Sequence, residues 1–84
     1  MRFDVFFSNQ AKKFLKKSDI VLLKRLFKKI EELREKPFLH DSKTIEGSEK
    51  LFRVRVGDFR ILYEVDHMKN FIGIVKIDKR DSVY

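Results

Sequence analysis

The N-terminal part of the chain changes from an alternating to a helical pattern of apolar residues. Residues 2–7, RFDVFF, alternate and predict a short strand. The apolar residues of 8–17 and 18–35 then recur at the three- and four-residue spacing of amphipathic helices. Ser8 is a good N-cap for the first helix, and Pro37 stops the second. Because few residues separate the two helices, the pattern predicts an antiparallel helical hairpin.

The C-terminal part of the chain contains three further strand patterns. Residues 37–50 contain the only Pro of the chain and are predicted to form a loop. Strands are then predicted at about 51–56, 59–65 and 71–77, with short polar links between them. Links this short join antiparallel neighbours, so the three strands should form a meander. The predicted fold class is α+β: an N-terminal strand, a two-helix hairpin and a three-stranded antiparallel meander, with one sheet packed under the helices.

The hairpin LFRVRVGDFRILYEV, residues 51–65, decides which side chains share a face. Gly57-Asp58 fits a two-residue turn, and this turn pairs Arg55 with Arg60. Residues directly opposite each other share a face, so the apolar residues of both strands should point toward the helices. The same register places three arginines on the other face, where we expect their side chains to be exposed: Arg53, Arg55 and Arg60.

Three guanidinium groups on one sheet face predict an anion site. Arg55 opposite Arg60 is a like-charge pair, which costs stability unless a nearby carboxylate such as that of Glu64 relieves it. Arg binds phosphate through a bidentate fork, and several Arg together can neutralise the extra charge of a phosphoryl transition state. The alternative is a basic face that is simply solvated.

Composition and charge narrow the function classes. The 84 residues are expected to form a single domain, residues 1–84. Twenty Lys and Arg against 13 Asp and Glu give a net charge of +7, which indicates a polyanionic partner or, alternatively, a Lys-rich protein adapted for solubility and heat.

Without Cys and with two distant His, no metal or cofactor is expected. No apolar run approaches the roughly 18 residues of a membrane span and no signal peptide opens the chain, which predicts a soluble, cytoplasmic protein.

The sequence resembles a known family of toxins. The order of its predicted elements, the hairpin LFRVRVGDFRILYEV and the ending IDKRDSVY are together similar to the RelE/ParE toxin superfamily, and more to its RelE branch. The resemblance covers nearly the whole chain. It implies the toxin of a type II toxin–antitoxin system, which enters the ribosomal A site and cuts mRNA there without a metal. The 2′-OH of the message would attack the adjacent phosphate and leave a 2′,3′-cyclic phosphate and a 5′-OH.

The resemblance also implies roles for five residues. Arg53 and Arg55 match basic positions on the first hairpin strand, and Arg60 matches an arginine that stabilises the phosphate charge. Arg80 matches the arginine that protonates the leaving oxygen, and Tyr84 matches a tyrosine that stacks on the substrate base. From its position alone, Tyr84 would be a mobile terminal residue.

One departure from the family concerns the general base. The best-known members carry Lys at the positions of Arg53 and Arg55, whereas Arg is a poor base because its pKa lies above about 12. Either Glu64, on the same predicted face, substitutes for it, or Arg55 only organises the phosphate and the 2′-OH. Two other functions stay open: a ParE-type inhibitor of DNA gyrase, and a basic RNA- or ribosome-binding protein without catalysis.

The implied partners are a RelB-like antitoxin, the ribosomal A site and its mRNA, and no membrane. The antitoxin would wrap the domain and cover or distort the basic site. A net charge of +7 suits an acidic antitoxin. Exposed parts of the apolar stripe on the second helix could hold an antitoxin helix in a groove, although most of that stripe is expected to be core.

Overall fold

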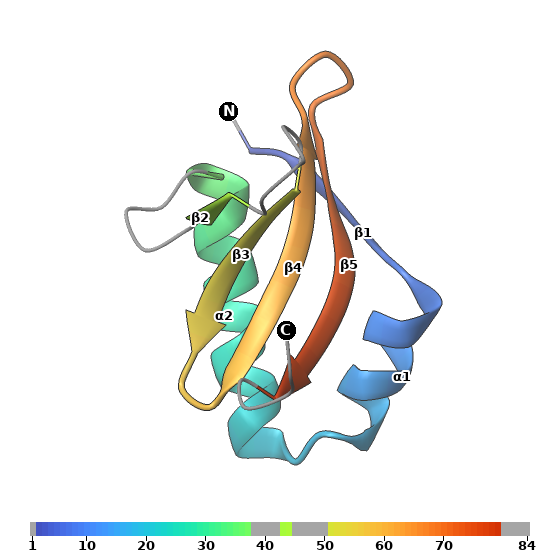
Figure 1. Ribbon diagram of the computed structural model, residues 1–84, viewed down its shortest axis with the longest axis vertical. Helices are drawn as coiled ribbons and strands as arrows, with labels where there is room; N and C mark the ends of the chain where they lie inside the picture. The colour runs from blue at the N-terminus through green and yellow to red at the C-terminus, as the bar shows by residue number, and fades with distance from the viewer. Residues whose placement is uncertain (1, 38–42, 45–50, 80–84) are drawn as a thin grey trace.

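The computed structural model describes residues 2–37, 43–44 and 51–79 (Figure 1). The elements follow the chain as β1 (Asp4–Phe7), α1 (Asn9–Lys17), α2 (Ile20–Glu35), β2 (Lys43–Thr44), β3 (Leu51–Val56), β4 (Phe59–Asp66) and β5 (Phe71–Lys79). This order confirms the predicted α+β fold. The two-residue β2 lies inside the segment predicted as a loop. A strand this short has too few positions to produce an alternating pattern.

All five strands form one sheet in the order β1-β5-β4-β3-β2. β3, β4 and β5 are the predicted antiparallel meander. β1 pairs in parallel with β5, and the two helices make the long connection that a parallel pair requires. β1 is therefore an edge strand, and β5 and β4 are central.

The predicted register of the β3–β4 hairpin is confirmed, including the Arg55–Arg60 pair. Gly57 has a φ of 59°, which the first position of a two-residue turn of the II′ type requires and which a residue with a Cβ adopts only with strain. A Cβ at Gly57 would also lie 2.5 Å from Nη2 of Arg25 on α2, but this guanidinium is the end of a flexible side chain and can move away. The positive φ is therefore the constraint that favours Gly at this turn.

The core lies between the helices and one face of the sheet. Its buried apolar side chains come from both helices and the three long strands: Ala11, Leu26, Ile30, Leu33, Val54, Val56, Ile61, Tyr63, Val65, Ile72, Ile74 and Ile77. The hydroxyl of Tyr63 donates a hydrogen bond of 2.7 Å to the carbonyl oxygen of Pro37. This bond satisfies the polar end of a fully buried ring and ties the segment after α2 to the centre of the sheet.

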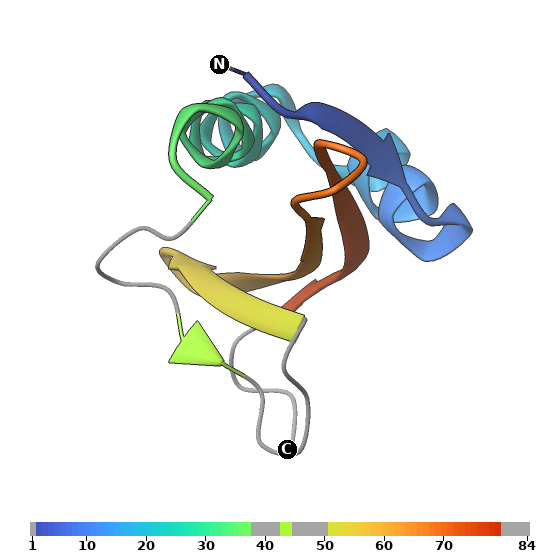
Figure 2. The same ribbon diagram turned by 90° about the horizontal axis from the view of Figure 1, so that it is seen from above.

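The first helix begins at the predicted cap Ser8, the second begins at Asp19, and the two run in opposite directions (Figure 1). The Ser8 side chain accepts a hydrogen bond from the N–H of Ala11, and Asp19 accepts one from the N–H of Leu22. Seen from above, α2 lies on the concave side of the curved sheet (Figure 2). Neither helix of the described residues has the length and apolar character of a membrane span.

The first turn of α1 continues the edge of the sheet where β1 ends. The side-chain amide of Gln10 donates to the carbonyl of Ile77 at 2.8 Å and accepts from its N–H at 3.0 Å. The hydroxyl of Ser8 donates to the carbonyl of Val75 at 2.7 Å. These side chains satisfy backbone groups of β5 that have no strand beside them.

Candidate active site

Three of the predicted site residues lie together on the face of the sheet opposite the helices. Arg53 and Arg55 belong to β3, and Arg60 belongs to β4. Arg55 lies directly opposite Arg60, and Arg53 lies opposite Leu62. Because opposite residues share a face, the three guanidinium groups lie on one side, which we call the arginine face.

The three arginines differ in exposure. Arg55 is exposed and Arg53 is half-buried, but Arg60 is only 9% exposed and its Nε is buried. The expectation that Arg60 would be an exposed side chain is wrong. β4 is a central strand, so neighbours on both β3 and β5 flank Arg60. A guanidinium in such a place loses hydration, and only interactions with other groups can offset this loss.

A carboxylate lies on the arginine face next to Arg60. Asp78 on β5 is directly opposite Arg60 in the β4–β5 register, so Arg55, Arg60 and Asp78 form one row across three strands. The Asp78 side chain is 15% exposed, and its carboxylate lies 3.7 Å from Nζ of Lys76. Lys76 lies opposite Leu62 on the same face. The arginine face therefore contains four cations and one carboxylate. The carboxylate of Asp78 has Arg60 beside it on β4 and Lys76 beside it on β5.

A bulge in β5 explains why sequence analysis missed Lys76 and Asp78. The β4–β5 register shifts at Val75, which is the extra residue on β5. Strict alternation after Ile74 would have placed Lys76 and Asp78 in the core. The signal was the apolar spacing, because Ile77 is buried three residues after Ile74 rather than two or four.

Glu64 shares the arginine face but lies away from its charged row. It is four residues from Arg60 along β4, which corresponds to about 13 Å at roughly 3.3 Å per residue. The Glu64 carboxylate lies over Gly73 of β5, 3.0 Å from the position that a Cβ would occupy. The expectation that Glu64 relieves the Arg55–Arg60 pair is therefore wrong. Its position also makes it a poor substitute for the missing base.

Two of the predicted site residues, Arg80 and Tyr84, lie outside the described residues, and their roles stay predictions. β5 itself ends at Lys79, which pairs with Phe59, the residue before Arg60. The last described residue is therefore at the same end of the sheet as the charged row.

The groups on the arginine face suit phosphate chemistry. Guanidinium and ammonium groups donate hydrogen bonds to phosphate oxygens, and a carboxylate can accept a proton. Among the residues that the structure describes, no group of three or more His, Cys, Asp or Glu could hold a metal ion. The cations and the carboxylate of the described part of the site can bind an anion and transfer a proton.

Comparison with known proteins assigns the chain to a family. A family model described as the ParE toxin of type II toxin–antitoxin system, parDE, matches residues 5–84. The chain belongs to the RelE/ParE superfamily of toxins. The RelE1 protein of Methanocaldococcus jannaschii is 34% identical over 87 residues, which cover 100% of this chain and 97% of the relative.

Solved structures of RelE toxins share the fold. The archaeal RelE–RelB complex from Pyrococcus horikoshii matches with a TM-score of 0.85 and 26% identity, over 99% of this chain and 100% of that one. The RelB–RelE complex from Methanococcus jannaschii matches with a TM-score of 0.73 and 30% identity, over 94% of each chain. The chain is thus a RelE-like toxin, and its arginine face unites three of the five residues that the family resemblance implied.

Proposed function

We propose that this RelE-like toxin is a ribosome-dependent mRNA endonuclease, that residues 1–84 act as one toxin domain in the cytoplasm, and that a cognate antitoxin neutralises it. The observation that carries the proposal is the row Arg55–Arg60–Asp78, in which a nearly buried guanidinium lies between a like charge and a carboxylate. Directly opposed like charges are unfavourable in a sheet, and an anionic ligand between them would offset this cost. A message phosphate supplies that charge.

The cations of the row would bind the scissile phosphate. The oxygen of the message's 2′-OH attacks the adjacent phosphorus, and the bond from phosphorus to the 5′-oxygen breaks. Arg55 and Arg60 hold the non-bridging oxygens and stabilise the charge that develops there, and Arg53 extends this cradle. As the resemblance implies, Arg80 protonates the leaving 5′-oxygen and Tyr84 stacks on the neighbouring base.

Asp78 is our candidate for the general base. Arg53 and Arg55 replace the lysines of the best-known members, and they are poor general bases because a guanidinium stays protonated in proteins. The register places the Asp78 carboxylate opposite Arg60, where the phosphate would lie, whereas Glu64 is about 13 Å along the strand. Asp78 would take the proton of the 2′-OH, so that the products are a 2′,3′-cyclic phosphate and a 5′-OH.

The helical side of the molecule supports a ribosomal target. α1 contains four exposed lysines and no acidic residue: Lys12, Lys13, Lys16 and Lys17. Such a surface favours binding to a nucleic-acid backbone through the release of counterions. Together with the net charge of +7, it gives the toxin an electrostatic attraction to ribosomal RNA that does not depend on the arginine face.

The antitoxin partner is supported by solved complexes of similar toxins. The matching structures from Pyrococcus horikoshii and Methanococcus jannaschii are complexes of RelE with RelB. We infer an antitoxin of the same type for this chain. Its negative charge would complement the basic surface and speed association.

A comparison of the two possible targets in living cells tests the proposal. The toxin is induced, and growth, cleavage of translated messages and chromosomal DNA breaks are followed together. We expect arrest to coincide with message cleavage and without DNA breaks. Arrest with DNA breaks and intact messages would overturn the proposal in favour of a gyrase inhibitor of the ParE type. Binding to ribosomes with neither effect would indicate a non-catalytic member.

A further inference from the structure

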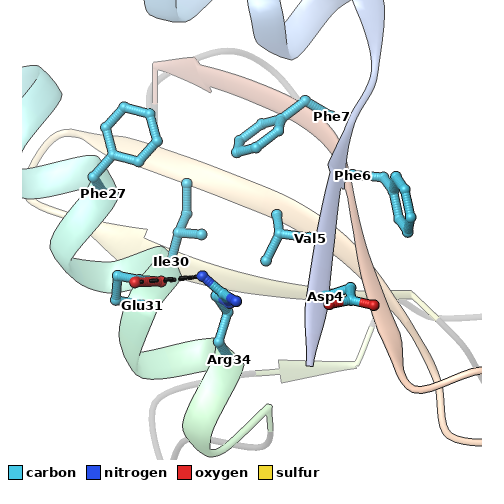
Figure 3. Close-up of a pocket in the computed structure, with 8 residues that line it drawn as sticks. All are labelled: Asp4, Val5, Phe6, Phe7, Phe27, Ile30, Glu31 and Arg34. Carbon is cyan, nitrogen blue, oxygen red and sulfur yellow. Dashed lines mark hydrogen bonds and ion pairs between the residues drawn. The ribbon is translucent and has the colours of Figure 1, made fainter. Parts of the chain in front are cut away.

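A shallow hollow of about 460 Å³ lies at β1 and β5, on the same side of the sheet as the arginine face. Figure 3 shows Phe7 pointing into the groove between β1 and α2, and its neighbour Phe6 pointing away from that groove. Phe6 is opposite Gly73 of β5, and Gly73 is opposite Glu64 of β4, so these three residues form one row. We call the hollow the aromatic notch, and it is lined by Phe6, Phe71, Gly73, Val75 and Glu64.

Gly73 leaves the floor of the aromatic notch open. It lies inside β5, and a Cβ at this position would be 3.0 Å from Oε1 of Glu64. A glycine in a strand interior weakens the strand and often marks a site where a ligand comes close to the backbone. The strands of Phe6 and Glu64 are about 9–10 Å apart, because neighbouring strands are about 4.8 Å apart and β5 lies between them. A planar ring can therefore lie over Gly73.

The two phenyl rings of the notch offer a surface for stacking. Phe6 is 60% exposed. Its ring contacts the half-buried ring of Phe71 edge to face, with centroids 5.4 Å apart and planes at 87°. This contact orients the Phe6 ring, and the exposure leaves its surface available to another aromatic ring.

The charged side chains that surround the notch are carboxylates. Glu64 is exposed, and its carboxylate makes no hydrogen bond or ion pair with another described residue. Asp4 and Asp66 lie opposite Phe71 on its two sides, and Asp66 accepts a hydrogen bond of 2.9 Å from the N–H of Lys69. An ionised carboxylate only accepts hydrogen bonds, so the notch attracts N–H groups and repels phosphate.

The cations of the arginine face begin in the next row. Arg53 and Lys76 lie opposite Leu62, two residues before Glu64 on β4, and the Arg60 row is about 13 Å from Glu64. A single RNA strand along this face would keep its phosphates on the cations and could turn a base into the notch. Bases of single-stranded RNA are bound in this way, stacked on aromatic rings and hydrogen-bonded at their edges.

We infer that the aromatic notch binds an unpaired base of the message near the cleaved bond, and binds guanine better than the other bases. This inference rests on the mRNA substrate of the proposed function. The base stacks on Phe6, and the Glu64 carboxylate accepts hydrogen bonds from N1–H and N2–H of guanine. Uracil suits the notch least, because carbonyl oxygens flank its single N–H on both sides.

A basic segment of a protein is the other ligand with N–H donors. Arg53 and Lys76 in the adjacent row and the net charge of +7 would repel such a segment. The same cations attract RNA, so they favour a base of the message over a basic peptide.

The test measures the binding of two RNA pentamers to the purified toxin by fluorescence anisotropy. One pentamer contains only uridine, and the other has one guanosine at its centre. Phe6→Ala removes the stacking ring, and Glu64→Gln replaces one of the two acceptor oxygens by a donor. The controls on α2 are Phe27→Ala, which removes a phenyl ring that is 41% exposed, and Glu32→Gln, which makes the same change of charge as Glu64→Gln.

We expect the wild type to bind the guanosine pentamer about 10-fold more tightly than the uridine pentamer. Glu64→Gln should make the two affinities nearly equal, and Phe6→Ala should weaken binding of the guanosine pentamer by about 10-fold. Both controls should stay within about twofold of the wild type. Circular dichroism checks that each variant is folded, and Glu64→Gln decides the question if Phe6→Ala is not.

The outcomes separate this inference from the proposed reaction. Equal affinity of the wild type for the two pentamers, binding of neither, or the same guanine preference in Glu64→Gln and Glu32→Gln would overturn the inference and leave message cleavage intact. A wild type that binds only an arginine-rich peptide, through Glu64, would also overturn it, in favour of a basic protein segment. A guanine preference that Glu64→Gln removes, in a toxin that cuts no message, would support the notch and contradict only the proposed reaction.

Discussion

The arginine face and a groove of about 510 Å³ between β1 and α2 lie on the two sides of one sheet, and they differ in how they are built. The arginine face belongs to the central strands, where the partners on both sides fix each residue by register. The groove lies at the edge strand β1, where aromatic side chains lack a further strand or helix to cover them. The chemistry that we propose needs fixed geometry and would use the most constrained part of the sheet. The groove lies at the least covered part of the sheet, where aromatic surface stays accessible.

The largest expected effect is the loss of cleavage in Arg60→Ala. Removal of one preorganised donor to a developing charge lowers rates by about 100- to 1,000-fold in comparable sites. Because Arg60 is only 9% exposed, the melting temperature of Arg60→Ala should also differ from that of the wild type. Cleavage of a translated message is measured against Lys69→Ala, which removes an exposed charge from the β4–β5 turn. If Arg60→Ala cleaves the message as fast as this control, Arg60 is not part of the active site.

Asp78→Asn should have the next largest effect, a decrease of about 100-fold in the cleavage rate, if Asp78 accepts the proton of the 2′-OH. Asp78→Glu keeps a carboxylate that can accept the proton and should retain more of the cleavage rate than Asp78→Asn. Equal decreases in the two variants would assign Asp78 to positioning.

Gly57→Ala should destabilise the hairpin that aligns Arg55 with Arg60. The positive φ predicts a loss of about 1–3 kcal/mol in the free energy of unfolding, which urea unfolding measures. The guanidinium of Arg25 is the end of a flexible side chain and can move away from a new Cβ, so the loss should be nearly the same in the background of Arg25→Ala. A loss that disappears in this background would show that contact with Arg25, and not the φ angle, is the constraint at the turn.

The smallest expected effect concerns the rim of the groove. Partial desolvation raises the pKa of the Glu31 carboxyl, but hydrogen bonds from Arg34 and Arg2 outweigh it, and the pKa lies below its ordinary value of 4.5. A lowered pKa means that the ion pairs stabilise the fold above pH 4.5 and that this stabilisation is lost as the pH falls through the lower, folded value. Melting temperatures followed through this range should decrease more for the wild type than for Glu31→Gln. If the melting temperatures of the two proteins decrease in parallel, the Glu31 ion pairs do not stabilise the fold.

Local sequence patterns were sufficient to predict the register of the β3–β4 hairpin. They were not sufficient to predict the pairing of β1 with β5 or the burial of Arg60. The two-residue turn and the alternation of apolar residues left one register, and this register placed Arg53, Arg55 and Arg60 correctly. The parallel pairing of β1 with β5 depends on contacts between distant segments, and no local pattern encodes it. The burial of Arg60 follows from the position of β5 beside β4, and is likewise a tertiary effect.

The position of Asp78 was missed, although the sequence contains a signal for it. The spacing of Ile74 and Ile77 already indicated an extra residue in β5. With that bulge included, Lys76 and Asp78 move from the core side to the arginine face. A break in strict alternation near a charged face is thus a signal that sequence analysis can use.

The most direct measurement is primer extension on a message translated in vitro, with and without the purified toxin. We expect cuts that appear only while ribosomes translate the message, and no cuts in the same RNA without ribosomes. The upstream fragments should end in a 2′,3′-cyclic phosphate. A message that stays intact while the folded toxin binds ribosomes would contradict it, and the arginine face would then be a binding surface without catalysis.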